Sequence, residues 1–330
     1  MKNKNIENDV MGRLTSEQKK AFKGKILEEN RRTENYLKFT KLIAQKLSNH
    51  KHAYSFLKSL YGLYWKIVGP FHILPDFIIF GIGRAGSTSL YEGIMEHPDV
   101  HSAKIKEIYF FDYKFKRGIY WYRGHFPSVW KKIFYTKLRK KKFITGEATA
   151  RLLSYPHAPK RILKIIPNVK LIAILRNPID RAYSLYNVEV ANGREQLSFE
   201  EAIKVESKRL AGEMERMKTD ENYYSGEFYR KSYLFQGIYA DGLKMWFDVF
   251  PKEQFLIIDF DELARNPTPI YDKIFDFLEL PKFTHSKHIV YNTRKYDDMV
   301  PSTRKYLIEY FKPHNEQLYN LLGKKFDWDK

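Results

Sequence analysis

The sequence predicts an α/β fold, in which a parallel β-sheet is flanked by helices and preceded by an N-terminal helical extension. Three continuous apolar runs support this prediction, at residues 77–80, 170–175 and 255–259. Strands that are buried on both faces of a parallel sheet have this continuous apolar character. Amphipathic helical stretches alternate with the runs, which is the pattern of a sheet covered by helices on both faces.

The extension corresponds to residues 1–74 and the α/β domain to residues 75–330. Residues 1 to about 50 are charged and poor in glycine and proline, as in a helix with frayed ends. Residues 54–67 are basic and aromatic. That pattern fits a helix packed against the main domain, which we favour, or a helix lying on a membrane surface.

The elements of the α/β domain follow in chain order. A helical pattern after the first strand continues to His97 and is closed by Pro98. The remaining strands have helical patterns around them, at residues 159–166, 178–191 and 239–250. The last helix is expected over residues 302–322, with a break or kink at Pro313. Two segments show no clear pattern, residues 113–145 and 194–236. Within the second, the charged stretch 207–233 suggests a mobile lid.

The 330-residue chain is aromatic, basic and free of cysteine. Its aromatic content of 16% allows enough apolar burial to offset the entropy of folding, which argues against disorder. The absence of cysteine excludes a disulfide scaffold and a cysteine–zinc site, and it favours a reducing compartment. A formal charge of +19 predicts an anionic partner: nucleic acid, a membrane surface, or a phosphorylated or sulfated small molecule.

A glycine-rich turn, GIGRAGSTS (81–89), follows the first strand and opens the first helix. Such a turn presents backbone N–H groups at the positive end of a helix, where proteins bind phosphate. Its three glycines permit a tight turn and close approach of an anion. This P-loop-like turn predicts an anion site formed by Arg84, Ala85, Gly86, Ser87, Thr88 and Ser89.

Two phosphate-binding motifs fit this turn only in part. The ATPase motif G-x-x-x-x-G-K-S/T fails, because Ser87 occupies the lysine position. The dinucleotide motif G-x-G-x-x-G matches, but it expects an acidic residue about 20 positions later, at the end of a second strand. Asp99 lies near that distance within a sequence that indicates a turn. A structural glycine turn without a ligand therefore stays an alternative.

A second anion site is predicted at the end of the strand over residues 170–175. Arg176 ends that strand, Pro178 can begin the next helix, and Ser184 lies two turns further on, facing back towards the sheet edge. An arginine at the carboxyl end of a strand, together with a helix hydroxyl, can bind an anion beside the glycine-rich turn.

This combination resembles the sulfotransferase family that uses 3′-phosphoadenosine 5′-phosphosulfate (PAPS), especially the heparan sulfate and related carbohydrate sulfotransferases. The resemblance covers about residues 75–325. Three more stretches match, KEIYFFD (106–112), GEAT (146–149) and TRKY (293–296). Any one motif is weak, but five in order make a strong signal. The resemblance implies that Arg84 to Ser89 hold the 5′-phosphosulfate, and that Arg176 and Ser184 hold the 3′-phosphate.

The resemblance also implies the catalytic residues. Glu107 would be the base that takes the acceptor proton, the alternative being a surface ion pair with Lys104 or Lys106. The family usually has lysine where this chain has Arg84. Arginine stays protonated, so Arg84 would act as an electrostatic clamp on the leaving phosphate, with Lys106 or Lys295 as alternatives for part of that role.

A late basic loop completes the implied donor site. Arg294, Lys295 and Tyr296 would close over the 3′-phosphate or the sulfate, and a solvated basic turn is the alternative. No metal site is expected, because the ten histidines are scattered. His97, His101 and His125, near the expected cleft, fit packing or substrate contact better than metal ligation.

The tract from Lys131 to Lys142 holds seven basic residues interleaved with two aromatic ones. A solvated surface is the favoured interpretation, and contact with an anionic lipid or an acidic glycan is the alternative. Nucleic acid is disfavoured, because no nucleic-acid-binding motif accompanies the tract. Peripheral membrane contact is thus left open for this tract and for the N-terminal extension.

The sequence therefore predicts a cytoplasmic, metal-independent sulfotransferase. It would transfer the sulfuryl group of PAPS to a hydroxyl, less readily an amine, of a carbohydrate, glycolipid or related metabolite. The alternatives are a P-loop nucleotide kinase and a non-catalytic protein that binds anionic glycans or nucleic acid.

Overall fold

The structure, a computed structural model, describes residues 60, 62–285 and 297–328. Residues 66–330 form one compact unit. Most of the predicted extension, residues 1–74, lies outside the described residues, so its boundary and the helical character of residues 1–59 stay predictions. Residues 62–68, which the structure describes, are helical. None of the helices within the described part of the chain is long and apolar enough to cross a membrane.

A five-stranded parallel sheet lies within this unit, in the order β2-β3-β1-β4-β5. The three apolar runs form β1 (Phe77–Gly81), β4 (Lys170–Leu175) and β5 (Phe255–Asp259). On the other side of β1, the sheet continues with β3 (Ile144–Ala148) and β2 (Val100–Ser102). The predicted α/β fold with a parallel sheet is therefore confirmed.

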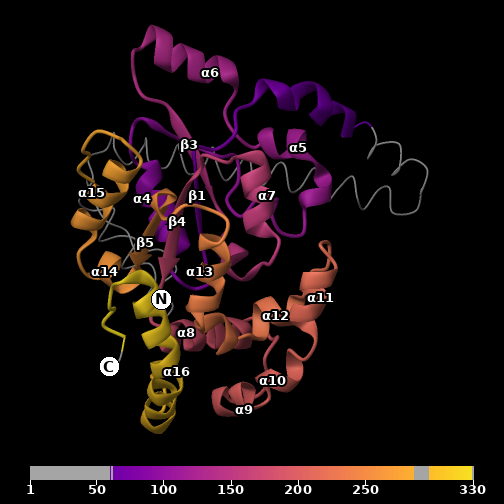
Figure 1. The fold of residues 1–330 in the computed structure, drawn as a ribbon, viewed down its shortest axis with the longest axis vertical. Coiled ribbons are helices and arrows are strands. Elements are labelled where there is room, and N and C mark those ends of the chain that lie inside the picture. Colours follow the sequence, from indigo (N-terminus) through magenta and orange to yellow (C-terminus); the bar gives the residue numbers. More distant parts are fainter. Residues whose placement is uncertain (1–59, 61, 286–296, 329–330) are drawn as a thin grey trace, which may run out of the picture. The chain divides into compact units, whose positions relative to one another are not determined.

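Helices connect and cover these strands (Figure 1). Their bounds are α4 (Ser87–Met95), α5 (Ile119–Arg123), α6 (Val129–Ile133), α7 (Ala158–Ile165), α8 (Pro178–Ala191), α9 (Phe199–Lys204), α10 (Glu206–Arg209), α11 (Glu213–Thr219), α12 (Gly226–Lys231), α13 (Tyr239–Phe247), α14 (Phe260–Arg265), α15 (Pro267–Phe277) and α16 (Pro301–Leu322).

The side chains of β1 alternate between two buried faces of the sheet. Phe77 and Ile79 belong to an apolar cluster with residues of α4, α14 and α15. Phe80 points to the opposite face, where its ring stacks on that of Trp246 in α13 at a centroid distance of 4.1 Å. Helices therefore cover both faces (Figure 1), which explains why β1 is apolar throughout.

The strand β3 was not predicted, because its residues, ITGEA, contain no apolar run. Gly146 and Glu147 are both unusual inside a strand. A Cβ at Gly146 would lie 2.4 Å from the ring of Phe77, so the absence of a side chain lets that ring pack against β3. Glu147 is 1% exposed and accepts hydrogen bonds from Tyr122, which is distant in the sequence, and from Thr149.

The predicted helices are present, with shifted ends. The first begins at Ser87, within the glycine-rich segment, and the one expected to end at Phe250 ends at Phe247. The last helix continues through Pro313 without the break that was considered. Buried residues lie on both sides of this proline, among them Phe311 and Leu318, so both halves of the helix pack against the protein.

The segment 194–236, for which the sequence shows no clear pattern, is largely helical and contains α9 to α12. The lid expected over residues 207–233 stays a prediction. Buried acidic residues organise the segment. Glu206 accepts backbone hydrogen bonds from Leu234 and Phe235, both at 2.8 Å. Such a carboxylate satisfies buried N–H groups of a turn that has no regular structure of its own.

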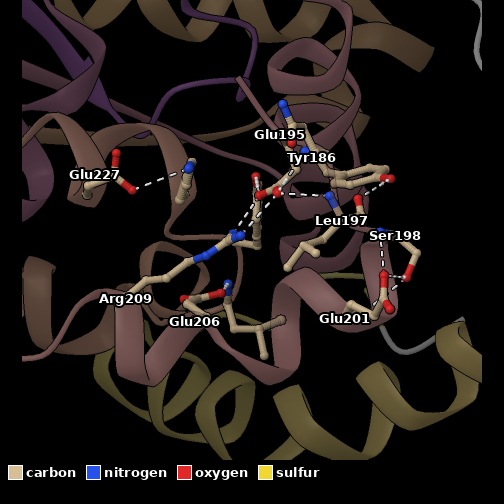
Figure 2. A network of polar contacts seen from close by, with 12 residues as sticks. Tyr186, Glu195, Leu197, Ser198, Glu201, Glu206, Arg209 and Glu227 are labelled. Carbon is tan, nitrogen blue, oxygen red and sulfur yellow. Dashed lines mark hydrogen bonds and ion pairs between the residues drawn. The ribbon is translucent and has the colours of Figure 1, made fainter. Parts of the chain in front are cut away.

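Glu195 is the second buried acidic residue of this segment (Figure 2). Its oxygens accept hydrogen bonds from Arg209 at 2.6 and 3.1 Å, from the Tyr233 hydroxyl at 2.9 Å and from the Leu197 N–H at 3.2 Å. Burial alone would raise the pKa of Glu195, but the hydrogen bonds, first that from Arg209, lower it to about 2. The carboxylate is therefore charged at neutral pH and relies on Arg209.

Replacing Arg209 should destabilise the protein strongly. Arg209→Gln leaves Glu195, whose side chain is 1% exposed, without its cation, and we expect a loss of about 3 kcal/mol in the free energy of unfolding. Lys218→Gln is the matched control, because it breaks the exposed ion pair with Glu215 and should cost less than about 1 kcal/mol. Urea unfolding of both variants measures the difference. Equal losses would show that the buried pair is not structurally important.

Candidate active site

The carboxyl ends of the parallel strands gather the predicted site residues at one edge of the sheet. Because β1 lies between β3 and β4, the turn that follows β1 has the ends of both neighbours beside it. The N–H of Thr149, just after β3, donates to the carbonyl of Ile79 at 3.0 Å. Ligands of open α/β sheets bind at this edge.

The turn after β1 has a left-handed backbone at two positions. Gly86 has φ +86° and precedes α4, where no side chain makes a capping hydrogen bond. A Cβ at Gly86 would lie 2.1 Å from the ring of Phe260, so only glycine fits. Arg84 has φ +76° although it carries a side chain. This backbone leaves the start of α4 without a side-chain cap, the condition for binding an anion there.

The two predicted anion motifs are in direct contact. Arg84 Nε donates to Ser184 Oγ of α8 at 3.2 Å. The Arg176 guanidinium donates to the carbonyl of Arg84 at 3.1 Å and lies 5.0 Å from the centroid of the Phe260 ring. The hydroxyl of Tyr239 donates to the Arg176 carbonyl at 2.8 Å. These contacts tie together the segments that follow β1, β4 and β5.

One polar atom of this cluster lacks a partner. Arg176 Nε is buried and makes no hydrogen bond to any atom of the described residues. A buried guanidinium nitrogen without an acceptor is costly, so its presence here is consistent with a site that accommodates an anionic group. The residues present therefore fit the phosphate groups of a nucleotide.

The remaining residues of the turn line or support the start of α4. Ser87 and Ser89 are buried, and Thr88 is half-buried. Ala85 is fully buried and belongs to the apolar cluster beneath the turn. The hydroxyl of Tyr271 in α15 donates to the carbonyl of Ser89 at 3.2 Å, which ties the first turn of α4 to α15.

Glu107 lies at the same edge, next to the end of β3. Its N–H donates to the carbonyl of Ala148 at 3.0 Å, and Glu107 Oε1 accepts from the N–H of Ala150 at 3.4 Å. Lys106 Nζ lies 2.8 Å from the same oxygen, so the ion pair that was the alternative is present. This ion pair leaves Glu107 accessible to a ligand, because the side chains of Lys106 and Glu107 are 20% and 24% exposed.

The backbone at Glu107 is strained. Glu107 has φ +58° and Tyr109 has φ +59°, values rare for residues other than glycine. Ile108 and Phe110, which flank Tyr109, are at most 1% exposed and hold the segment in place. Strain of this kind costs on the order of 1–3 kcal/mol per residue and clusters at functional sites. Here the strained backbone places the side chains of Glu107 and Tyr109 at the sheet edge.

Two buried carboxyl groups lie close to Glu107. Burial raises the pKa of Glu147 to about 7, although hydrogen bonds from Tyr122 Oη at 2.5 Å and Thr149 Oγ1 at 3.1 Å act in the opposite direction. Burial likewise raises the pKa of Asp112 to about 6. Glu147 is therefore partly protonated near neutral pH, which limits the negative charge around Glu107.

An arginine surrounded by tyrosines also lies beside Glu107. Arg151 follows Ala150, and its guanidinium lies 4.3 Å from the ring centroid of Tyr109 and 4.7 Å from that of Tyr229. It donates to the Tyr224 hydroxyl at 3.0 Å, and the ring of Tyr113 lies 4.7 Å from that of Tyr224. Together these side chains form the Arg151 cluster, which consists of Tyr109, Tyr113, Arg151, Tyr224 and Tyr229.

Sequence reasoning missed the Arg151 cluster. Its members come from residues 109–113, from residue 151 and from residues 224–229, and no local pattern connects them. The available signal was the position of Arg151, two residues after the matching stretch GEAT. By contrast, the packing role expected of three histidines is observed. His97 lies against Phe275, His101 against Phe143, and His125 against Trp121.

Part of the implied site lies outside the described residues. Arg294, Lys295 and Tyr296 fall there, so their role as a closing loop stays a prediction. Among the described residues, no group of three His, Asp or Glu side chains could hold a metal ion.

Comparison with known proteins identifies the family. The family model described as "Sulfotransferase domain" matches residues 74–330. The chain belongs to the sulfotransferase family. The resemblance inferred from the five motifs is thereby confirmed, and this membership argues against both the nucleotide kinase and the non-catalytic binding protein.

The names of the relatives of this sulfotransferase give either a substrate or a location. It is 27% identical over 327 residues to "Membrane-associated sulfotransferase kil1" of Dictyostelium discoideum, covering 79% of this chain and 68% of that protein. It is also 27% identical over 279 residues to human "Heparan sulfate glucosamine 3-O-sulfotransferase 5", covering 77% and 74%.

A third relative is longer than this sulfotransferase. "Bifunctional heparan sulfate N-deacetylase/N-sulfotransferase 1" of Caenorhabditis elegans is 27% identical over 278 residues, which cover 76% of this chain but only 30% of that protein. Among solved structures, a sulfotransferase from Alicyclobacillus acidocaldarius matches with a TM-score of 0.57 and 28% identity, over 78% of this chain and all of that one.

The glycine at position 86 should be indispensable for the stability of the anion turn. Gly86→Ala places a Cβ against the Phe260 ring at φ +86° and should lower the free energy of unfolding by at least about 1 kcal/mol. Gly83→Ala is the matched control in the same turn, where a Cβ meets nothing within 4 Å and should change stability by less than about 0.5 kcal/mol. Urea unfolding measures both variants. Equal unfolding midpoints for Gly86→Ala and Gly83→Ala would contradict this interpretation.

Proposed function

We propose that this sulfotransferase transfers the sulfuryl group of PAPS to a hydroxyl of a carbohydrate or glycolipid that carries an anionic group. The observation that carries the proposal is the bonded set of Arg84, Ser184 and Arg176 at the start of α4, at the same sheet edge as Glu107. PAPS supplies an activated sulfuryl group on a phosphate leaving group, and its use is a property of the family.

The proposed donor residues divide into two groups. The residues from Arg84 to Ser89 bind the 5′-phosphosulfate through the N–H groups and hydroxyls at the start of α4, while Arg176 and Ser184 bind the 3′-phosphate. Because Arg84 Nε bonds to Ser184 Oγ, the Arg84 guanidinium extends from the first group to the second. It stabilises negative charge on the leaving phosphate without giving up a proton.

Glu107 is the proposed general base. Its carboxylate takes the proton of the acceptor hydroxyl as the acceptor oxygen bonds to sulfur and the bond between sulfur and the leaving phosphate oxygen breaks. Lys106 orients the carboxylate through the 2.8 Å ion pair. Two hydrogen bonds hold Glu107 at the end of β3, so the base is positioned before substrate binds.

The Arg151 cluster is the proposed acceptor-binding surface. Tyrosine rings pack against the apolar faces of sugar rings, and a guanidinium pairs with a carboxylate or sulfate. Tyr224 is 38% exposed, so part of the cluster is accessible to a ligand. Relatives whose names include heparan sulfate act on an anionic glycan, which supports this acceptor class. We propose a hydroxyl as the acceptor atom, with an amine as the alternative.

We further propose a cytoplasmic location, on the ground that the sequence contains no cysteine. Fractionation of the source cells, followed by immunoblotting of the soluble, membrane and secreted fractions, tests this proposal. Recovery of the protein from the secreted fraction would contradict it.

Changing the proposed base should abolish turnover and spare donor binding. Glu107→Gln should lower kcat by at least about a hundredfold, because the amide cannot accept the proton. Transfer of radiolabelled sulfate from PAPS to heparan-type oligosaccharides, with and without free amines, measures this. Glu215→Gln is the matched control, since its carboxylate is exposed in α11, and it should leave kcat unchanged.

Calorimetry on the same variants separates the base from the donor site. Adenosine 3′,5′-bisphosphate should bind the wild type and Glu107→Gln equally, and ATP should bind both weakly. Tight binding of ATP with weak binding of the bisphosphate would contradict the donor assignment. Full activity of Glu107→Gln would contradict the assignment of the base alone.

Changing Arg151 should affect the acceptor and not the donor. Arg151→Gln should raise the KM for an anionic oligosaccharide at least about tenfold, the effect of losing one charge-assisted hydrogen bond, while the KM for PAPS stays unchanged. Arg216→Gln is the matched control, because Arg216 also lies over a tyrosine ring, that of Tyr223 at 4.1 Å. A parallel rise in both KM values for Arg151→Gln would indicate a structural role.

A further inference from the structure

The helical segment that precedes β3 presents its apolar side chains to solvent. Helix α6 continues directly into a π-helical turn, Phe134–Leu138, and residues 129–138 stand out from the sheet at the end where β3 begins (Figure 1). Four large apolar residues of this segment are exposed: Trp130 by 68%, Ile133 by 42%, Phe134 by 43% and Leu138 by 73%.

The spacing of these four residues is that of one helix face. They occupy positions i, i+3, i+4 and i+8, the pattern that normally faces a protein core. Here the residues that pack inwards are different ones. The Tyr135 ring contacts those of His101 and Phe143, and Lys132 Nζ lies 3.5 Å from Asp76. The apolar face thus points away from the unit to which the segment is attached.

Basic side chains surround this apolar face. Residues 129–142 contain seven Lys or Arg and no Asp or Glu. Six of the seven are exposed in the structure: Lys131, Lys137, Arg139, Lys140, Lys141 and Lys142. The segment therefore combines an exposed apolar stripe with a concentrated positive charge.

We propose that residues 129–142 dock onto the surface of an anionic lipid membrane. The interface of such a membrane offers apolar acyl chains to the four apolar residues and acidic headgroups to the lysines and arginine at the same time. A tryptophan at the edge of the apolar stripe fits the headgroup level. A nucleic acid or an acidic glycan would match the charge and offer rings to Trp130, but neither provides acyl chains for the exposed aliphatic residues Ile133 and Leu138.

Vesicle sedimentation with the full-length protein tests the docking surface. Wild type should bind vesicles of phosphatidylcholine with about 30% phosphatidylserine at least tenfold more tightly than vesicles of phosphatidylcholine alone. The double variant Trp130→Ser/Leu138→Ser should lose at least tenfold in affinity for the acidic vesicles. Tyr306→Ser is the matched control, because Tyr306 is 56% exposed in α16, and it should bind as wild type does.

The two components of the surface can be tested separately. The charge is tested by Lys137→Glu/Lys140→Glu, which should abolish the preference for phosphatidylserine. The apolar stripe is tested by tryptophan fluorescence, which should shift to the blue when the wild type binds vesicles. Trp130→Phe should remove that shift. Circular dichroism and urea unfolding confirm that each variant is folded, which is expected because every changed side chain is exposed.

Three results would overturn the proposal. The first is equal vesicle binding by wild type and Trp130→Ser/Leu138→Ser, which would move membrane contact to another part of the chain. The second is binding to heparin, but not to vesicles, that depends on the lysines alone, which would indicate an acidic glycan. The third is a dimer in light scattering that the apolar substitutions dissociate, which would make a second copy the partner.

Discussion

The packing of one aromatic ring holds the candidate donor site together. Phe260, the first residue after β5, fills the space that a side chain at Gly86 would occupy and lies beneath the guanidinium of Arg176. Through this ring, the segments that follow β1, β4 and β5 share one set of contacts. The left-handed turn at Gly86 and the position of the Arg176 guanidinium both involve this ring.

Near β3, on the other side of β1, a strained backbone positions Glu107 and burial raises the pKa of Glu147. The left-handed backbone at Glu107 and Tyr109 is held by buried neighbours, so packing and the hydrogen bonds of Glu107 together fix the base. Beneath it, Glu147 is buried with its own partners. Because its pKa is raised to about 7, Glu147 is only partly charged at neutral pH and repels the carboxylate of Glu107 less than a fully charged group would.

The features that could be predicted from the sequence are those that follow from local residue patterns. The strands β1, β4 and β5 are apolar throughout because both of their faces are covered, and the contact between Arg84 and Ser184 follows from parallel strands ending at one edge. The strand β3 could not be predicted, because the burial of Glu147 requires the hydroxyl of Tyr122 from a separate segment. The Arg151 cluster could not be predicted either, since its residues come from three segments that are far apart in the sequence.

The direction of the parallel strands has a consequence for how this enzyme would meet its acceptor. The segment 129–142 leads into the start of β3, and Glu107 lies at the end of β3. A strand of five residues spans about 17 Å. With that segment on a bilayer, the catalytic edge would be held above the lipid headgroups. With β3 upright on the bilayer, the proposed acceptors would then be limited to glycans and glycolipids whose sugars extend about that far into the water, and the membrane would act as a tether for the enzyme.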